Sequence, residues 1–366
     1  MNKTTSISNE SIEKNTNLKK LDDFKTNILG QILDFLDSTI NEKTKKGILE
    51  KLNDRFDEIY DAYSITEKKF KYRRRDSGEM YITHINGVLD IYINSLFNLN
   101  DKLKNLDNKK EIDRKKAIEF VKNEISIIAT IIEHDSIEDT DTTMEGLNER
   151  FTSNKLVGFT TYLLSKKPFS LCINDTDDLK EFNEVKKTGI LNEKGLISDL
   201  IKKKIQVNEA SEEELVKYTV GDDHNLTELQ INGLEKYRKL ENKYKNNRNE
   251  NYFTHYKSIY SLMKHAKKLL NDKNLHFSKE DFKIIIYNTI IIKLADRIHN
   301  LNDIAYAWAD KPERIEKKLL ETETYLLPIA KEFDNDIFIY ITNEIKRIRL
   351  EINKKYTSNK VNNIIK

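Results

Sequence analysis

Apolar residues recur three and four positions apart along most of this chain, which is the spacing of amphipathic helices. Between 21 and about 66, this spacing predicts two helices that pack together as a hairpin. Two further amphipathic helices are expected near the end of the sequence. Other segments, such as SIIATIIEH, are apolar nearly all round, which predicts helices at the centre of a bundle. The central helices are expected at 79–97, 112–135 and 278–308, and the late amphipathic helices at roughly 311–333 and 336–356.

Two segments depart from this pattern. Residues 1–20 are rich in Ser, Thr, Asn and Lys, so we expect a flexible tail. Between about 166 and 250, charges alternate and apolar residues thin out, which predicts an inserted helical excursion. This insertion is either a solvated helical hairpin or a lid or partner surface. The predicted order is the tail, the N-terminal hairpin (21–66), a first core part (67–165), the insertion, and a second core part with the C-terminal helices (251–366).

The composition favours an all-α fold. The 366 residues include only 10 glycines and 3 prolines, whereas sheets would need more turns. A charged fraction of 34% beside a hydrophobic fraction of 38% indicates a densely charged surface over a sizeable core. The formal net charge of +2 gives no global reason to expect nucleic acid or an acidic membrane as a partner.

The same sequence predicts a cytoplasmic location. Cys172 is the only cysteine, which excludes an internal disulfide framework and a multi-cysteine metal site, and fits a reducing compartment. The first 20 residues contain no apolar segment typical of a signal peptide. The longest apolar stretch, at 284–295, is broken by Asn288 and Thr289 and is too short to span a bilayer.

The first candidate site is the segment IIEHDSIEDT at 131–140, where polar residues end an apolar run. On one helix, residues four positions apart lie on the same face. This spacing places His134 beside Glu138 and Asp135 beside Asp139. Burying so much negative charge without a cation would be costly. An imidazole beside carboxylates suits Mn²⁺, Fe²⁺ or Zn²⁺ better than Ca²⁺. The alternative is an acidic helix end that leads into a loop.

The second candidate is KLADRIHN at 293–300, which follows the most hydrophobic helix. Asp296 and Asn300 are four residues apart on one helix face, and Lys293 lies one turn earlier. A carboxylate that arrives from a buried helix is a plausible additional metal ligand. The alternative is a helix that emerges into solvent, which would place Arg297 and His299 at the surface.

The third candidate is RRRDSGEMYITHINGV at 73–88. Three arginines precede a Ser-Gly turn and a helix that carries His84. Arginines at a turn before a helix suit bidentate phosphate contacts, although a triple arginine is also common on solvated surfaces.

In this order, RRRDSGEMYITH, EHDSIEDT and KLADRIHNL resemble the motifs of the HD-domain hydrolases of the stringent response, the RelA/SpoT homologues and the small alarmone hydrolases. The HD dipeptide alone would indicate only the broad HD phosphohydrolase superfamily. The resemblance covers roughly 55–165 and 250–335 and implies an HD-domain helical bundle with a charged helical insertion and extra N-terminal helices. It also implies Mn²⁺-dependent removal of the 3′-pyrophosphate from the nucleotide (p)ppGpp. Because the chain ends soon after the bundle, we expect a hydrolase without a synthetase.

The resemblance assigns roles to the polar residues at matching positions. It implies that four residues bind the metal: His84, His134, Asp135 and Asp296. It implies that Glu138 and Asp139 position or deprotonate the attacking water. The implied substrate contacts are Arg75, Ser77, Lys293 and Asn300. This agrees with the chemistry, because cleaving a pyrophosphate from a nucleotide needs a metal, cations for the phosphates and a base for water.

The chain also departs from the family pattern. Met80 and Ile85 stand where the family usually has proline, and we expect changed loop stiffness there because neither position is a ligand. Asp139 and Asp296 are more than twice as far apart in sequence as is usual in the family. This insertion leaves two alternatives open: an HD hydrolase of another phosphorylated nucleotide, or a non-catalytic protein that senses nucleotides. The presence of both Glu138 and Asp139 argues against the sensor, which would need no base.

Overall fold

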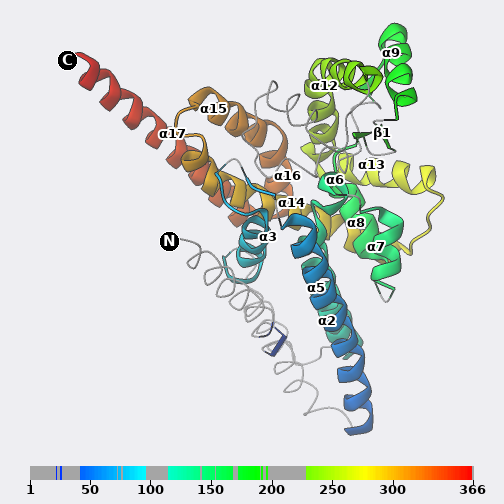
Figure 1. Ribbon diagram of the computed structural model, residues 1–366. Coiled ribbons are helices and arrows are strands. Elements are labelled where there is room, and N and C mark those ends of the chain that lie inside the picture. Colours follow the sequence, from blue (N-terminus) through cyan, green and yellow to red (C-terminus); the bar gives the residue numbers. More distant parts are fainter. Residues whose placement is uncertain are drawn as a thin grey trace, which may run out of the picture.

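A computed structural model of the chain describes residues 22, 25–26, 42–71, 73–75, 77–95, 114–140, 142–152, 154–167, 172–189, 191–192, 195–196 and 228–364. The predicted tail at 1–20 lies outside these residues. The described chain is all-α, as predicted, apart from a two-residue antiparallel pairing of Leu191–Asn192 (β1) with Gly195–Leu196 (β2). The helices, shown in Figure 1, are α2 (Glu42–Phe70), α3 (Tyr81–Asp90), α5 (Arg114–Glu133), α6 (Ser136–Asp139), α7 (Met144–Arg150), α8 (Leu156–Leu164), α9 (Thr176–Lys187), α12 (Glu228–Thr254), α13 (Ile259–Asp272), α14 (Lys279–Ala307), α15 (Pro312–Glu321), α16 (Leu327–Phe333) and α17 (Asn335–Ile364).

The helix α14 forms the centre of the bundle. It packs against α3, α5, α8 and α17. Its buried residues include Thr289, Ile291 and Arg297, which point in different directions around the helix. The predictions of helices near 79–97, 112–135 and 278–308 are confirmed by α3 with its π-helical extension Ile91–Ser95, by α5, and by α14.

The N-terminal part of the described chain packs on this centre through α2, which lies along α5 (Figure 1). The second helix predicted within 21–66 is confirmed and extends to Phe70. Most of the first lies outside the described residues, but two contacts place its described part against α2. The Tyr60 hydroxyl donates to Asp22 Oδ1 at 2.6 Å, and Lys25 Nζ lies 3.9 Å from Asp57 Oδ1.

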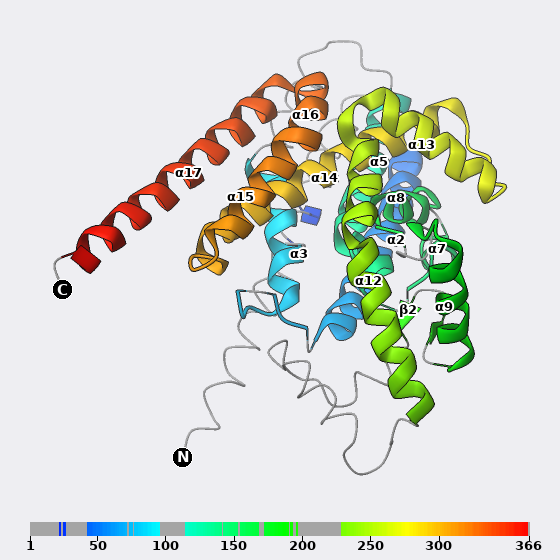
Figure 2. The same ribbon diagram turned by 90° about the horizontal axis from the view of Figure 1, so that it is seen from above.

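The predicted insertion contains a pair of packed helices, α9 and α12, which lie side by side in Figures 1 and 2. They share a small apolar cluster that is separate from the main core, made of Phe182, Val185, Leu234, Tyr237, Leu240 and Tyr244. The helix α12 does not end at residue 250 but continues to Thr254, so its last turn enters the main core through Tyr252 and Phe253.

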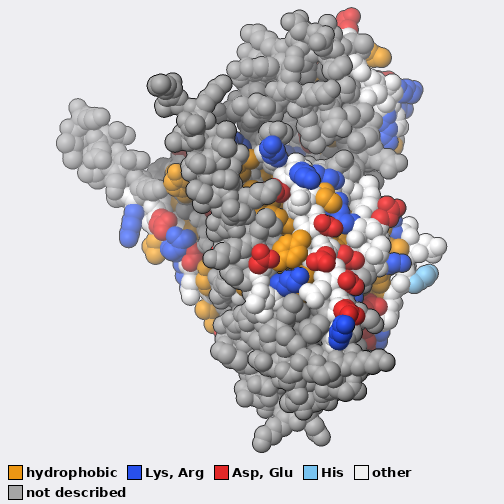
Figure 3. Space-filling model, turned by 60° about the horizontal axis from the view of Figure 1, so that its bottom comes forward, with side chains coloured by type: hydrophobic (Ala, Val, Ile, Leu, Met, Phe, Trp, Pro, Cys, Tyr) orange, Lys and Arg blue, Asp and Glu red, His pale blue; other side chains and the backbone are white. Residues whose placement is uncertain are grey.

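The late helices follow the predicted pattern. The run predicted at 311–333 is divided into α15, a π-helical segment and α16, with Pro328 in the first turn of α16. The final helix, α17, projects away from the rest of the molecule at its C-terminal end (Figure 2). No described helix is both long enough and apolar enough to cross a membrane. The described part of the face in Figure 3 carries basic and acidic side chains interspersed.

Candidate active site and metal centre

A tight turn positions the arginines ahead of α3. Gly78 has a φ of +84°, a left-handed conformation that glycine adopts without strain. The Arg75 N–H donates to the Glu79 carbonyl at 2.9 Å, and the Gly78 N–H donates to the Arg75 carbonyl at 2.9 Å. The Tyr81 N–H donates to the Arg73 carbonyl at 2.8 Å. The arginine segment is therefore held beside the start of α3, as the Ser-Gly turn in the sequence predicted.

The helix α5 ends just before the HD pair because side chains occupy its last carbonyl groups. His134 Nδ1 donates to the Ile131 carbonyl at 2.7 Å, and Ser136 Oγ donates to the Glu133 carbonyl at 2.7 Å. Such side-chain bonds compete with the backbone hydrogen bonds that would continue the helix. The HD pair therefore lies in a turn between α5 and α6.

The expectation that four polar residues share one face of a single helix is therefore wrong. His134 and Asp135 lie in the turn, whereas Glu138 and Asp139 close the short α6. One helical hydrogen bond still connects the HD pair to the Glu138–Asp139 pair: the Asp139 N–H donates to the Asp135 carbonyl at 2.8 Å. All four side chains still line the same cavity.

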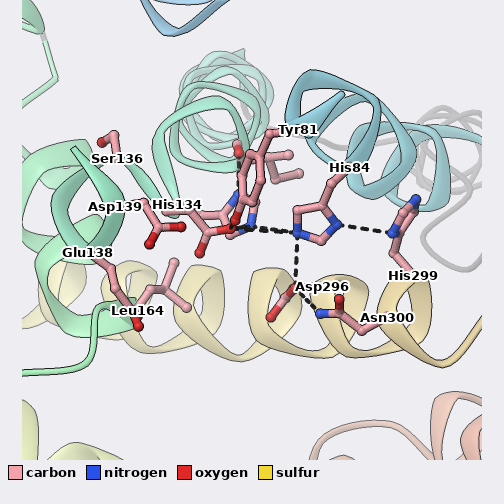
Figure 4. A network of polar contacts seen from close by, with 12 residues as sticks. Tyr81, His84, His134, Ser136, Glu138, Asp139, Leu164, Asp296, His299 and Asn300 are labelled. Carbon is pink, nitrogen blue, oxygen red and sulfur yellow. Dashed lines mark hydrogen bonds and ion pairs between the residues drawn. The ribbon is translucent and has the colours of Figure 1, made fainter. Parts of the chain in front are cut away.

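Three side chains form a group that fits one divalent cation. His134 Nε2 lies 3.3 Å from His84 Nε2 and 3.0 Å from Asp135 Oδ2, and His84 Nε2 lies 3.6 Å from the same carboxylate oxygen (Figure 4). Ligand atoms about 2.1 Å from one ion lie about 3.0–3.5 Å from one another in tetrahedral or octahedral coordination. Both imidazoles are almost completely buried. The donor set therefore suits a metal ion, and among the described residues these three form the group that could hold one.

Asp296 approaches this group from α14. Its Oδ1 lies 3.3 Å from His84 Nε2 and accepts a hydrogen bond from Asn300 Nδ2 at 2.6 Å, while its Oδ2 accepts one from Lys293 at 2.9 Å. Burial raises the pKa of Asp296, but the Lys293 ammonium and the His84 contact outweigh it and hold this pKa well below its usual value. Asp296 is thus an ionised carboxylate beside the three-residue group, where it can serve as a fourth ligand.

The alternative of a solvent-exposed helix at 293–300 is wrong. Arg297 is only 2% exposed, and it donates to Glu321 Oε1 at 2.7 Å and to Thr322 Oγ1 at 3.3 Å. The helix α14 continues to Ala307, so the motif lies within a buried helix and not at its exposed end.

His299 orients His84 by a hydrogen bond between their rings. Its Nδ1 lies 3.0 Å from both Arg75 Nη1 and His84 Nδ1. Arginine can only donate, so His299 Nδ1 is an acceptor and His84 Nδ1 must carry the hydrogen of the second bond. Burial, together with the neighbouring His84 and Arg75, lowers the pKa of His299 to about 3, which keeps this ring neutral. His84 Nε2 is then left with its lone pair directed toward the metal group.

A glycine on α3 makes room for His299. A Cβ atom at Gly87 would lie 1.9 Å from His299 Nε2, so no larger residue fits without displacing the ring. We expect Gly87→Ala to weaken metal binding about 10–100-fold, because it disturbs the hydrogen bond that orients His84. Metal titration of the purified variant measures this effect.

The control for this prediction is a double variant. Once His299 is alanine, the added methyl group at Gly87 no longer meets the ring, so Gly87→Ala/His299→Ala should bind metal as well as His299→Ala does. A further loss in the double variant would show that Gly87 acts by another route.

Glu138 is held by cations from two segments. The Lys166 N–H donates to its Oε2 at 3.1 Å, and its Oε1 lies 3.9 Å from Lys166 Nζ and 3.6 Å from Arg248 Nη2. Arg248 belongs to α12, and its Nε also donates to the Lys167 carbonyl at 2.7 Å. The predicted insertion therefore contributes a side chain that fixes a predicted catalytic carboxylate.

Asp139 is held by Arg73. Arg73 Nη2 donates to Asp139 Oδ1 at 2.7 Å and Nη1 donates to the Asp139 carbonyl at 3.0 Å. Burial and the charge of Asp135 raise the pKa of Asp139 to about 6, although Arg73 acts in the opposite direction. A carboxylate with a pKa close to neutrality suits a general base that works near pH 7.

These groups face one cavity of about 440 Å³, a size typical of small-molecule sites. The structure brings all ten predicted site residues to its walls: Arg75, Ser77, His84, His134, Asp135, Glu138, Asp139, Lys293, Asp296 and Asn300. Arg75 Nη2 donates to Asn300 Oδ1 at 2.7 Å, which joins two of the predicted substrate contacts. Ser77 Oγ is buried without a hydrogen-bond partner among the described residues, so this hydroxyl is available to a ligand.

The site also contains residues whose contacts the sequence did not predict. Arg73 holds Asp139, and the Tyr81 hydroxyl donates to Asp135 Oδ2. Both lie inside the RRRDSGEMY motif, and His299 lies three positions after Asp296 on α14, so proximity to the motifs was an available signal. Two further lining residues, Phe253 and Lys318, lie outside every motif and gave no such signal: the first is on α12 and the second on α15.

Comparison of the chain with protein-family models, with curated proteins and with solved structures finds no match. The chemistry open to the cavity follows from its donors. Two imidazoles and two carboxylates can hold a divalent cation, two further carboxylates can bind or deprotonate water, and basic side chains can bind phosphate oxygens.

Proposed function

We propose that this chain is a metal-dependent phosphohydrolase that removes the 3′-pyrophosphate of (p)ppGpp. His84, His134 and Asp135 would hold the cation together with Asp296, and Mn²⁺ suits this mixture of nitrogen and oxygen ligands. The cation would polarise the phosphorus atom that is bonded to the ribose 3′ oxygen and would offset the charge of the oxygens on that phosphorus. In the reaction, water adds to this phosphorus, the bond to the ribose 3′ oxygen breaks, and pyrophosphate is released.

One observation carries the proposal. The metal ligands, the carboxylates of Glu138 and Asp139, and the arginine turn come from three segments that are far apart in the sequence (73–84, 134–139 and 293–300), yet they line a single cavity. A structural metal site would need neither a second pair of carboxylates nor basic side chains around an open space. The order and content of the three motifs support (p)ppGpp as the substrate.

The chain's own residues divide the remaining work. Asp139 would accept a proton from water, and Glu138 would orient that water, since two cations already fix its carboxylate. Arg75 and Asn300, which bond to each other, would bind the nucleotide phosphates and sugar from one side. Ser77 would donate its unpaired hydroxyl, and Lys293 would hold Asp296 while facing the phosphates.

A second candidate is a hydrolase of another phosphorylated nucleotide. It is favoured by α12, because this helix from the predicted insertion lines the cavity with Phe253 and holds Glu138 through Arg248. For both candidates we infer a cytoplasmic location, because a single cysteine fits a reducing compartment.

The test is to incubate the purified chain with ppGpp, with and without Mn²⁺, and to separate the products by chromatography. We expect GDP and pyrophosphate to form only when the metal is present. Release of products from a different nucleotide in a parallel panel, with ppGpp untouched, would favour the second candidate. Absence of turnover on every nucleotide, with metal bound, would contradict both and favour a sensor.

A further inference from the structure

Four basic side chains surround one aromatic ring in the cavity. The ring is Phe253, in the last turn of α12, and it is 2% exposed. The charged groups come from three separate segments: the residues after α8, the middle of α14, and α15. Their distances to the ring centroid are 5.5 Å for Arg297, 5.7 Å for Lys318, 5.9 Å for Lys166 and 6.0 Å for Lys293. We call this part of the cavity the Phe253 lobe.

Two of these cations share one carboxylate. Lys318 Nζ and Arg297 Nη2 both lie 2.7 Å from Glu321 Oε1. One carboxylate neutralises one of the two charges, so the pair leaves one positive charge in excess. Burial and the neighbouring Arg297 lower the pKa of Lys318 to about 7, so an anion bound beside Lys318 would favour its charged form.

The remaining cations near Phe253 also outnumber their carboxylate partners. Lys166 and Arg248 share Glu138, whereas the carboxylate partner of Lys293 among the described residues is Asp296. When Lys318 is protonated, five cations in and next to the lobe therefore face three carboxylates among the described residues, which leaves an excess of two positive charges. Placing uncompensated charges of one sign so close together is costly unless an anion joins them.

We infer that the Phe253 lobe is a subsite for a phosphate group of the substrate, of the diphosphate class, next to the metal group. A diphosphate carries several oxygens that can accept hydrogen bonds from different directions, and Lys166, Lys293 and Lys318 approach the lobe from three segments. The lobe lies next to the metal site, because the Lys293 ammonium is 2.9 Å from Asp296, the proposed fourth ligand. The assignment to substrate depends on the proposed function, whereas binding of the anion itself does not.

Lys318 is the best residue for a test because a matched control is beside it. Lys317, on the same helix, is exposed and does not line the cavity. The full chain is loaded with Mn²⁺, freed of excess metal and titrated with inorganic pyrophosphate by calorimetry. Removing one charged donor costs about 1.5–3 kcal/mol, so we expect Lys318→Gln to raise the Kd for pyrophosphate about 10–100-fold. Lys317→Gln should bind like the unmodified chain.

Further measurements separate the possible outcomes. An equal Kd in Lys318→Gln and in the unmodified chain, with equal metal content and equal helical circular dichroism, would overturn the subsite. Should Lys318→Gln lose its helical signal, Lys166→Gln carries the same test, because Lys166 lies after α8, outside the helices, and reaches the same lobe.

Kinetic measurements with ppGpp then show whether the anion that the lobe binds is part of the substrate. If the lobe binds the substrate, Lys318→Gln should raise KM or lower kcat as well as weaken pyrophosphate. Weaker pyrophosphate binding with unchanged kinetics would overturn the assignment to substrate and indicate a site for a free anion. If no chain hydrolyses ppGpp, the proposed function fails, but the pyrophosphate titration still decides whether the lobe binds a diphosphate.

Discussion

Replacement of Asp139 by asparagine should lower the turnover of ppGpp about 10²–10⁴-fold, the range expected when a general base is removed. The amide keeps the shape of the side chain but cannot accept the proton from water. Asp139 is the stronger candidate for the base among Glu138 and Asp139, because its pKa of about 6 leaves it mostly ionised at pH 7 yet basic enough to accept a proton. The same change at Glu138 should lower turnover within the same range if Glu138 orients the water.

The dependence of turnover on pH provides a second test of Asp139. Burial and the charge of Asp135 raise the pKa of Asp139 to about 6 in the metal-free site, and a cation bound to Asp135 would lower this pKa again. Turnover of the metal-loaded chain should therefore fall at or below about pH 6, where the base becomes protonated. The residual activity of Asp139→Asn should not show this fall. Glu145→Gln is a matched control, since Glu145 is 63% exposed on α7 and should leave both turnover and profile unchanged.

Both tests require that the amide variants bind as much metal as the unmodified chain. Neither Glu138 nor Asp139 belongs to the three-residue metal group, so elemental analysis should find the same metal in the amide variants. Full turnover in both amide variants would remove these residues from the mechanism. Loss of metal together with turnover would instead make them ligands.

The sequence predicted the helices well because burial has a clear periodic signature. Segments that are apolar nearly all round, such as α14, can only be stable in the centre of a bundle. It also predicted which polar residues meet, through the order and content of three motifs. All ten residues reach one cavity because α3, the end of α5 and α14 pack against one another.

Other features depend on contacts between distant segments and were not predictable from spacing. The helix α5 ends before His134 because the His134 and Ser136 side chains bond to its last carbonyls, an event that periodicity does not report. Phe253 and Lys318 reach the cavity because of how α12 and α15 pack. The interpretation of 166–250 as a solvated excursion also missed that Arg248 holds Glu138.

Replacement of His134 by alanine, or of Asp135 by asparagine, should remove tightly held metal, with an affinity at least about 100-fold lower than that of the unmodified chain. His134→Ala deletes one of three donors that lie within 3.6 Å of one another, and Asp135→Asn removes the negative charge of another. The remaining ligands, even with Asp296, hold the ion much more weakly. Elemental analysis after dialysis measures the effect. His276→Ala is the matched control because His276 is exposed and lies outside the cavity. A full metal complement in His134→Ala or Asp135→Asn would contradict the assigned ligands.

The protonation state of His134 provides a second test of the assigned metal ligands. Burial lowers its pKa, but the Asp135 and Asp296 carboxylates outweigh burial and raise this pKa to about 9, so in the metal-free site a proton on His134 partly balances the two acids. A metal ion must displace that proton, so metal affinity should rise about tenfold per pH unit as the pH increases toward 9. Calorimetry in buffers of different ionisation enthalpy should detect about one proton released per ion. Asp135→Asn removes the main cause of the raised pKa, so its residual metal binding should release less than one proton at pH 7, whereas His276→Ala should release as many as the unmodified chain.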